Sequence, residues 1–306
     1  MKRGINIGDH FENTYDTDKE FINPVKDWYY DQIVKLGFDH VRLPVRWSIW
    51  TDDKNGFKIK ENFFYEVEKT VKRFLDCGLE VILNVHHFRE AMDEPMKYSK
   101  KLYAIWEQVG ERFANYPNEL IFEVMNEPTW RATDEEWNQV QAEAVKVIRK
   151  TNPTRRIEVC GIDYSGLVAL DRLVLPDDDN LIATFHFYDP FEFTHQGAEW
   201  SPSMKDTKGI RWLGTDDDKE FIMARIVAHA KNFSRTHNNI EMNLGEFGAY
   251  YKYAKPEDRE NWTRCVRECC EKLGFSWTYW DFNRNFGLFD FDGNLRQEIA
   301  DALLKD

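Results

Sequence analysis

The sequence contains no long apolar run, no CxxC pair and no low-complexity segment. No stretch approaches the roughly 18 consecutive apolar residues of a membrane-spanning helix, so a membrane partner is not expected. The first residues, MKRGINIG, are polar and strand-like where a secretory signal would carry an apolar segment. We therefore expect no signal peptide in this chain, and either a cytoplasmic protein or a secreted one whose signal has been removed.

Cysteine is scarce and basic charge is in the minority. The chain has five cysteines, an odd number, and none of them forms a CxxC pair. This is typical of a reduced, cytoplasmic-type protein. Lys and Arg total 41 against 54 Asp and Glu, giving a formal net charge of −13. A field of that sign repels phosphate backbones and anionic lipid, so nucleic acid is not an expected partner, whereas neutral sugars remain possible.

Eight short runs rich in β-branched residues recur along the chain, with stretches of helical periodicity between them. The expected strands are Gly4–Ile7, Val41–Val45, Val81–Val85, Ile121–Met125, Ile157–Cys160, Ile182–Phe187, Met242–Leu244 and Trp277–Trp280. Among the helical stretches, Phe64–Leu75 repeats its apolar residues at helical spacing and is followed by Gly78. Thr133 and Glu136 form a capping-box pattern at the start of another.

This alternation predicts an α/β fold, a single (β/α)8 TIM barrel over residues 1–306. A doubly wound open sheet is the structural alternative, but no GxGxxG follows the first strand and no P-loop is present. The connection from about Tyr188 to Thr215 is unusually long. Long βα-loops lie over the active face of barrels, so we expect this connection to be a functional wall.

Polar residues collect at the carboxyl ends of the expected strands, where barrel enzymes place catalytic groups. Glu127 ends the fourth strand and Glu246 the seventh, so the two face each other across the barrel mouth. Acetal hydrolysis needs one carboxylic acid and one opposing carboxylate. A lone glutamate at a strand end is usually solvated or paired with an arginine, but six polar clusters at the same end favour a catalytic site.

With these residues in view, the chain resembles glycoside hydrolase family 5, the barrel cellulases and related β-mannanases. The resemblance covers essentially the full length, through GINIG, HVRLPVRW, VILNVHH, FEVMNEP, ATFHFYDPFEFTHQGAEW, NLGEFGAY and TYWDF. An Asn-Glu-Pro on the fourth strand together with Glu-Phe-Gly on the seventh is a specific pairing. The stretch PFEFTHQGAEW is also similar to bifunctional glucanase–mannanases of thermophilic bacteria.

The resemblance implies roles for the residues that match its motifs. Glu127 would be the general acid/base and Glu246 the nucleophile. Asn126 would hold the sugar 2-hydroxyl, Arg42 would orient Glu246 and keep it ionised, and Tyr188 would donate a hydrogen bond beside the nucleophile.

Histidines and one tryptophan complete the implied core of the site. His87 and His186 would bind sugar or position Glu127, with His86 the weaker member of its pair, and Trp280 would stack on a sugar ring. The plainer interpretation is a set of buried imidazoles bonded to backbone, with Trp280 as simple core.

Two positions depart from the family pattern. Relatives usually carry Asn where this chain has Asp9, and many carry Glu where it has Asp281. Both positions are expected on the glycone side, so the departures concern substrate preference rather than the chemistry. Further candidates for substrate contact are Glu12, His195, Gln196 and Trp200.

The expected activity is that of a retaining endo-β-1,4-glucanase acting by double displacement, with mannan and glucomannan as further candidate substrates, without cofactor or metal and as a monomer. The alternative within the family is an endo-β-1,4-mannanase or another β-glycanase. We expect the two carboxylates about 5–5.5 Å apart and the pKa of Glu127 raised by ionised Glu246. Two rival classes are a metal-dependent barrel hydrolase using the histidines and a carbohydrate-binding barrel without catalysis.

Overall fold

Eight parallel strands close into one barrel in the computed structural model, which describes residues 1–12 and 22–305. The strands follow the order β1-β10-β9-β8-β7-β6-β5-β2, and β1 pairs with both β2 and β10. This closure rules out the open-sheet alternative. The barrel strands are β1 (Arg3–Asn6), β2 (His40–Leu43), β5 (Glu80–Asn84), β6 (Leu120–Glu123), β7 (Ile157–Val159), β8 (Leu181–His186), β9 (Glu241–Phe247) and β10 (Ser276–Tyr279).

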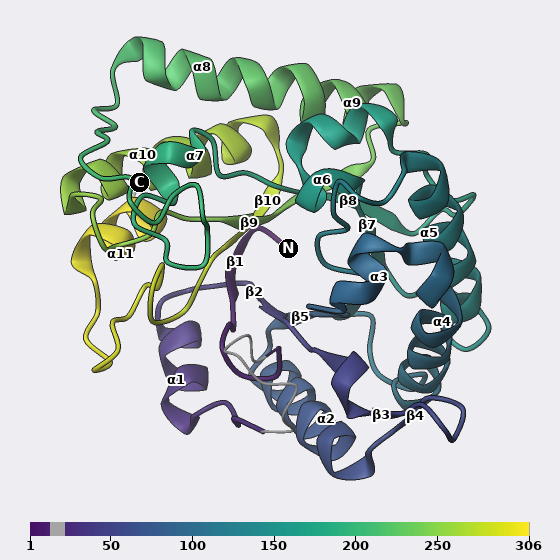
Figure 1. Ribbon diagram of the computed structural model, residues 1–306. Coiled ribbons are helices and arrows are strands. Elements are labelled where there is room, and N and C mark those ends of the chain that lie inside the picture. Colours follow the sequence, from purple (N-terminus) through teal and green to yellow (C-terminus); the bar gives the residue numbers. More distant parts are fainter. Residues whose placement is uncertain (13–21, 306) are drawn as a thin grey trace.

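Helices surround the strands on the outside of the barrel (Figure 1). The α-helices are α1 (Asp27–Lys35), α2 (Glu61–Asp76), α3 (Arg89–Asp93), α4 (Pro95–Arg112), α5 (Asp134–Arg149), α6 (Ile162–Ser165), α7 (Phe191–Thr194), α8 (Asp216–Ile226), α9 (Asn232–Thr236), α10 (Pro256–Leu273) and α11 (Gln297–Leu304). A small hairpin, β3 (Thr51–Asp52) with β4 (Lys58–Ile59), lies between β2 and α2 in the chain. None of the helices in the described residues combines the length and apolar character needed to cross a bilayer.

The local sequence signals act where they were expected. Thr133 accepts from the backbone N–H of Glu136, whose side chain returns to Thr133, so the capping box of α5 is confirmed. Gly78 follows the end of α2 with a φ of +81°, a conformation that glycine adopts without steric cost. These ends fix where each helix leaves the barrel wall.

All eight expected strands are present, and most bounds agree within two residues. The seventh is longer than expected, because β9 continues through Gly245 and Glu246 to Phe247. Its pairing with β8 shifts register between Phe185 and His186, so that His186 lies opposite Glu246. Such irregularities are frequent beside active sites, where they redirect side chains.

The barrel interior holds a polar layer beneath its mouth. Five fully or almost fully buried side chains form it, one from each of five strands: Asn6, Arg42, Glu123, Glu158 and Asn243. An apolar core of strand and helix residues encloses this layer. Burying so many polar groups is costly unless they pair, and their pairing shapes the site above.

Candidate active site

A cavity of about 450 Å³ opens at the carboxyl ends of the barrel strands. It is lined among others by Asp9, Glu12, His86, His87, Glu127, Tyr188, His195, Trp200, Glu246, Trp280 and Asp281. A second hollow of about 790 Å³ continues from it past Glu127 and Tyr188 toward Phe191 and Arg225. The two share Glu127, Tyr164, Tyr188, His195 and Trp200, so together they form one cleft across the barrel mouth.

Glu246 is held by two donors. Arg42 Nη1 donates to its Oε1 over 2.7 Å, and the Tyr188 hydroxyl donates to its Oε2 over 3.0 Å. Burial raises the pKa of Glu246, while His186 and Arg42 act in the opposite direction. The pKa of Tyr188 lies well above its usual value, because burial and the charge of Glu246 disfavour the phenolate. Tyr188 therefore remains a donor to the carboxylate.

Arg42 is itself fixed from below by Glu123. The pair makes two hydrogen bonds, Nε to Oε2 at 2.6 Å and Nη2 to Oε1 at 2.8 Å, with both side chains buried. Arg42 also donates to Oδ1 of Asn6 and of Asn126. Burial alone would lower the pKa of Arg42, but Glu123 and Glu246 raise it overall, so the guanidinium stays charged. Glu123 was not among the site residues expected from the sequence.

Glu127 lies opposite, in the segment that follows β6, with its side chain 22% exposed. His186 Nδ1 is 2.8 Å from Oε1 of Glu127. The backbone N–H of Glu127 donates to Ser165 Oγ. The pKa of Glu127 is raised to about 7, first by burial. The rise was expected, but its main cause is burial rather than a neighbouring charge, with a smaller contribution from Glu123. The repulsion between Glu127 and Glu246 raises the pKa of Glu246.

The histidines of the site are neutral at pH 7. Burial lowers the pKa of His186 to about 4 and that of His87 to about 3, and the pKa of His86 falls well below its usual value. Gly245 makes room for the His186 ring, because a Cβ there would lie 3.2 Å from Nε2 and 2.7 Å from Thr184 Oγ1. A neutral imidazole in this place can share a hydrogen bond with Glu127 without adding charge.

Four residues that line the cavity have left-handed backbone conformations: Asp9, His87, Glu127 and Tyr164, with φ between +47° and +63°. Non-glycine residues adopt such angles rarely, and they cluster at functional sites. Tyr164 belongs to a left-handed turn, Asp163–Ser165, which places Ser165 Oγ beneath Glu127. Nothing in the sequence pattern had identified Ser165.

Aromatic side chains line the cleft walls. The Trp280 ring is stacked parallel to His86, with centroids 5.9 Å apart, and Trp280 lines the cavity rather than the core. On the long loop after β8, His195 stacks on Phe191, and Trp200 is exposed above Phe286.

Gln196 on the same loop does not line the cleft. Its side chain is fully buried, and its amide bonds to the backbone of Phe193 and Ile210. Gln196 was expected to face substrate, but its side chain instead holds the loop together through these hydrogen bonds.

A metal-binding group can be assembled from the described residues only at the catalytic position itself. One ligand atom each from Glu127, His186 and Glu246 lie within 4.8 Å of one another. The charged Arg42 already contacts Glu246, and a second cation at that carboxylate would be repelled. The same spacing places one carboxylate oxygen of Glu127 within 4.8 Å of a carboxylate oxygen of Glu246. This is close to the separation of about 5–5.5 Å that is typical of retaining enzymes.

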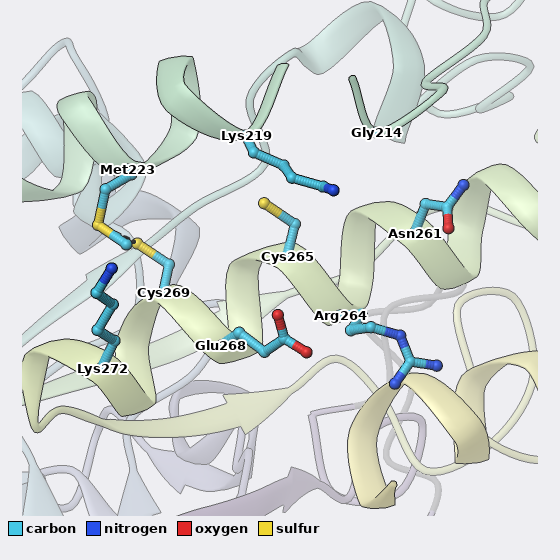
Figure 2. Close-up of a pocket in the computed structure, with 9 residues that line it drawn as sticks. All are labelled: Gly214, Lys219, Met223, Asn261, Arg264, Cys265, Glu268, Cys269 and Lys272. Carbon is cyan, nitrogen blue, oxygen red and sulfur yellow. Dashed lines mark hydrogen bonds between the residues drawn. The ribbon is translucent and has the colours of Figure 1, made fainter. Parts of the chain in front are cut away.

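A further hollow of about 290 Å³ lies on the outer face, between α8 and α10 (Figure 2). Its walls carry Lys219 and Met223 from α8 and Cys265 and Cys269 from α10. The Cys269 and Met223 sulfur atoms are 3.3 Å apart. This hollow is formed by helices outside the barrel, so it is separate from the cleft at the strand ends.

Comparison with known proteins agrees with the geometry. Endoglucanase H of Acetivibrio thermocellus is 34% identical over 292 residues, covering 95% of this chain but 30% of that longer protein. A crystal structure of the cellulose synthase subunit Z of Clostridioides difficile superposes with a TM-score of 0.93 at 37% identity over all of both chains.

Structures of Thermotoga maritima Cel5A with cellobiose and with mannotriose superpose with a TM-score of 0.92. They are 36% and 35% identical to this chain and cover 99% of it and 97% of their own chains. The model of one family, the cellulases of glycosyl hydrolase family 5, matches residues 8–286. The chain therefore belongs to the cellulase family, glycosyl hydrolase family 5.

Proposed function

We propose that the protein is a retaining endo-β-1,4-glucanase that cleaves internal bonds of β-1,4-glucan by double displacement. The observation that supports this most is the placement of Glu127 and Glu246, whose nearest paired oxygens lie within 4.8 Å. An inverting enzyme would need its carboxyl groups about 6.5–9.5 Å apart to admit a water between them.

Glu246 is the proposed nucleophile. Arg42 and Tyr188 donate to different oxygens of its carboxylate, which favours the charged form and aims one oxygen into the cleft. In the first step this oxygen attacks the anomeric carbon and the bond to the leaving oxygen breaks. Because both donors stay protonated, the carboxylate is held in place when it later departs.

Glu127 is the proposed general acid and base. With a pKa of about 7 it carries its proton near neutral pH and can give it to the departing oxygen. In the second step the same carboxylate takes a proton from the water that releases the sugar from Glu246. Neutral His186, 2.8 Å away, keeps Glu127 oriented through both steps.

Endo action follows from the shape of the cleft. It extends on both sides of the two glutamates, from Trp280 and Asp9 at one end to Phe191 and Arg225 at the other. A chain can therefore lie across the site with sugar units on each side of the bond to be cut. Exposed aromatic rings at Tyr164 and Trp200 offer faces on which sugar rings pack.

Mannan is a second candidate substrate, because Thermotoga maritima Cel5A has been crystallised with mannotriose as well as cellobiose. Glucose and mannose differ only in the orientation of the 2-hydroxyl. In this chain Asn126, held by Arg42, stands beside Glu127 where it can contact that hydroxyl. The same geometry accommodates either sugar if the loops allow it.

The direct test is release of reducing ends from β-glucan, glucomannan, galactomannan and xylan, with Glu246→Ala as the blank. Release from β-glucan supports the proposal, and release also from both mannans extends it to a dual specificity. Product release that a strong chelator abolishes and zinc restores would instead support metal catalysis. Binding of oligosaccharide by the folded protein without product release would support a carbohydrate-binding barrel.

A further inference from the structure

The left-handed turn Asp163–Ser165 contacts the chain on both sides of Glu127. The backbone N–H of Glu127 donates to Ser165 Oγ over 3.2 Å. The backbone N–H of Tyr164 donates to the carbonyl of Pro128 over 2.9 Å. One hydrogen bond therefore reaches the peptide group before Glu127 and the other the peptide group after Pro128. A single short turn holds the segment that carries the proposed acid and base.

Ser165 extends this contact through Cys160. Both side chains are 1% exposed, and the Ser165 hydroxyl hydrogen-bonds to the Cys160 side chain. Cys160 Sγ in turn donates to the carbonyl of Met125 over 3.5 Å. Burial raises the pKa of Cys160, so the thiol keeps the proton that it donates. A hydroxyl that accepts an N–H can still donate its own proton, so the two side chains together bridge the backbone of Glu127 to that of Met125.

The bridged segment has a backbone conformation that needs support. Glu127 has a φ of +49°, a left-handed angle that residues with a side chain adopt only where their surroundings hold them. Rotation about this bond moves the whole carboxyl group across the cleft. The hydrogen bond to Ser165 pairs the N–H at the same position, and a peptide N–H without a partner would favour another backbone angle. Ser165 therefore stabilises the angle that sets the direction of the Glu127 side chain.

Arg172 fixes the turn from its other side. Its Nη2 donates to Asp163 Oδ2 over 2.7 Å, and its Nε donates to Asp134 Oδ2 over 2.8 Å. Asp134 is the first residue of α5, whose start is already fixed by its capping box. The turn is thus tied to a helix of the barrel wall, so Ser165 approaches Glu127 from a fixed frame.

The end of the turn also meets β8. Gly166 pairs with His186 in an isolated parallel bridge, and His186 Nδ1 lies 2.8 Å from Oε1 of Glu127. The backbone of Glu127 is therefore held by Ser165 and its carboxyl group by His186, and these two supports are joined to each other.

We propose that Ser165 is a positioning residue for the general acid and base: its hydroxyl, with Cys160 behind it, fixes the backbone of Glu127 so that the carboxyl group meets the leaving oxygen. With a side chain that is 1% exposed, Ser165 acts on the reaction only through Glu127. This inference rests on the proposed function, which assigns the proton transfer to Glu127.

The test changes the leaving group, because that separates proton transfer from a general loss of structure. A cello-oligosaccharide releases a sugar hydroxyl that must be protonated as it departs, whereas 2,4-dinitrophenyl β-cellobioside releases a phenolate that leaves without a proton. For both substrates kcat/KM reports the first displacement. Ser165→Ala should lower kcat/KM for the oligosaccharide by about ten-fold or more, a part of the roughly 10²–10⁴-fold that general acid catalysis contributes. For the dinitrophenyl glycoside kcat/KM should stay within about two-fold of the native value.

A second variant keeps the test independent of folding. Ser165→Gly removes the same hydroxyl, and glycine adopts the φ of +54° at this position without steric cost. It should show the same selective loss even if Ser165→Ala does not fold. Thermal unfolding of each variant accompanies the kinetics.

The matched control is Ser234→Ala in α9. Ser234 is also a buried serine, 4% exposed, and its hydroxyl donates to the carbonyl of Ile240 over 2.9 Å. Its removal costs a buried hydrogen bond of the same kind, but kcat/KM should stay within about two-fold for both substrates. Glu127→Gln gives the upper limit of the selective loss.

Equal losses on the two substrates would show that the hydroxyl only stabilises the fold, and no loss on either would show that Glu127 is placed without it. Each of these outcomes overturns the positioning role of Ser165 while the proposed function stands. If the native protein hydrolyses neither substrate, the proposed function fails, and the positioning role fails with it.

Discussion

Glu123 and Arg42 form a two-point ion pair inside the barrel, with N–O distances of 2.6 and 2.8 Å and both side chains buried. The pair leaves one guanidinium nitrogen, Nη1, free to reach Glu246 at 2.7 Å. A planar guanidinium fixed along one edge has little freedom along the other. The position of the proposed nucleophile is therefore set by a carboxylate that does not touch the cleft.

Glu123→Gln should lower kcat by about 10²-fold with a smaller change in KM. The amide keeps the shape of the carboxylate but loses the charge that fixes Arg42, and a misplacement of about 1 Å at the reacting group costs on this scale. The measurement is steady-state kinetics on a soluble β-glucan, with the folded fraction checked by circular dichroism, because breaking a buried ion pair also destabilises.

The matched control is Glu158→Gln, on the neighbouring strand β7. Burial raises the pKa of Glu158 to about 8, so this residue is already neutral near pH 7. The substitution should therefore leave kcat within a few-fold of the native value. Equal losses in both variants would show that the barrel interior, rather than the Glu123–Arg42 pair, is responsible.

The pH dependence of activity should report on Glu127. Because its pKa is about 7 and it must be protonated to act as an acid, kcat/KM should fall as the pH rises above about 7. Glu127→Gln should remove this alkaline limb and slow hydrolysis most for substrates with poor leaving groups. An unchanged alkaline limb in the variant would assign the acid to another residue.

The sequence predicted the barrel well, because each strand is a short apolar run and each helix carries its own end signals. Thr133 and Gly78 act locally, so their effect is readable from a few neighbours. The seventh strand was cut short at Leu244 because Gly245 and Glu246 are poor strand formers in isolation. Pairing of Glu246 opposite His186 extends the strand, and that pairing is a tertiary effect.

The site was predictable where a side chain follows directly from a strand end, as for Glu127 and His186. Glu123 was not identified, because its role depends on its ion pair with Arg42, which lies on another strand. The short run FEV around Glu123 does not indicate that contact. The position of Ser165 beneath Glu127 depends on a left-handed turn, and the local sequence contains no signal that predicts this turn. Gln196 was expected in the cleft, but its hydrogen bonds to the backbone of Phe193 and Ile210 point its side chain into the interior of the loop.

Stability should fall as the pH rises from about 5 to about 8, in part through Glu158. Its pKa is about 8 in the folded protein and near 4.5 when unfolded. The folded state therefore binds the proton more tightly in this window, and stability is lost as the pH rises through it. Denaturant unfolding at several pH values should show a shallower decline for Glu158→Gln. An identical decline would mean that Glu158 is ionised in the folded state.

Gly245→Ala should fold but lose activity by about 10²-fold, on the scale of a misplaced catalytic group. The added Cβ would lie 2.7 Å from Thr184 Oγ1 and 3.2 Å from His186 Nε2, so the ring that supports Glu127 must shift. Kinetics and thermal unfolding are measured together. Adding Thr184→Ala removes the closer contact and should restore stability without restoring activity. Full recovery of activity in the double variant would show that His186 had not been displaced.

Glu246→Gln should abolish turnover, by on the order of 10⁴-fold or more, which is the scale for removal of a covalent nucleophile. The amide still fits between Arg42 and Tyr188, so the variant should fold and bind cello-oligosaccharide normally. Proton NMR of the native reaction supplies the complementary evidence. Retention requires that the β-anomer forms first and mutarotates afterwards, because two displacements at the anomeric carbon restore its configuration. An α-anomer as first product would indicate a single displacement by water, and Glu246 would then be a base rather than a nucleophile.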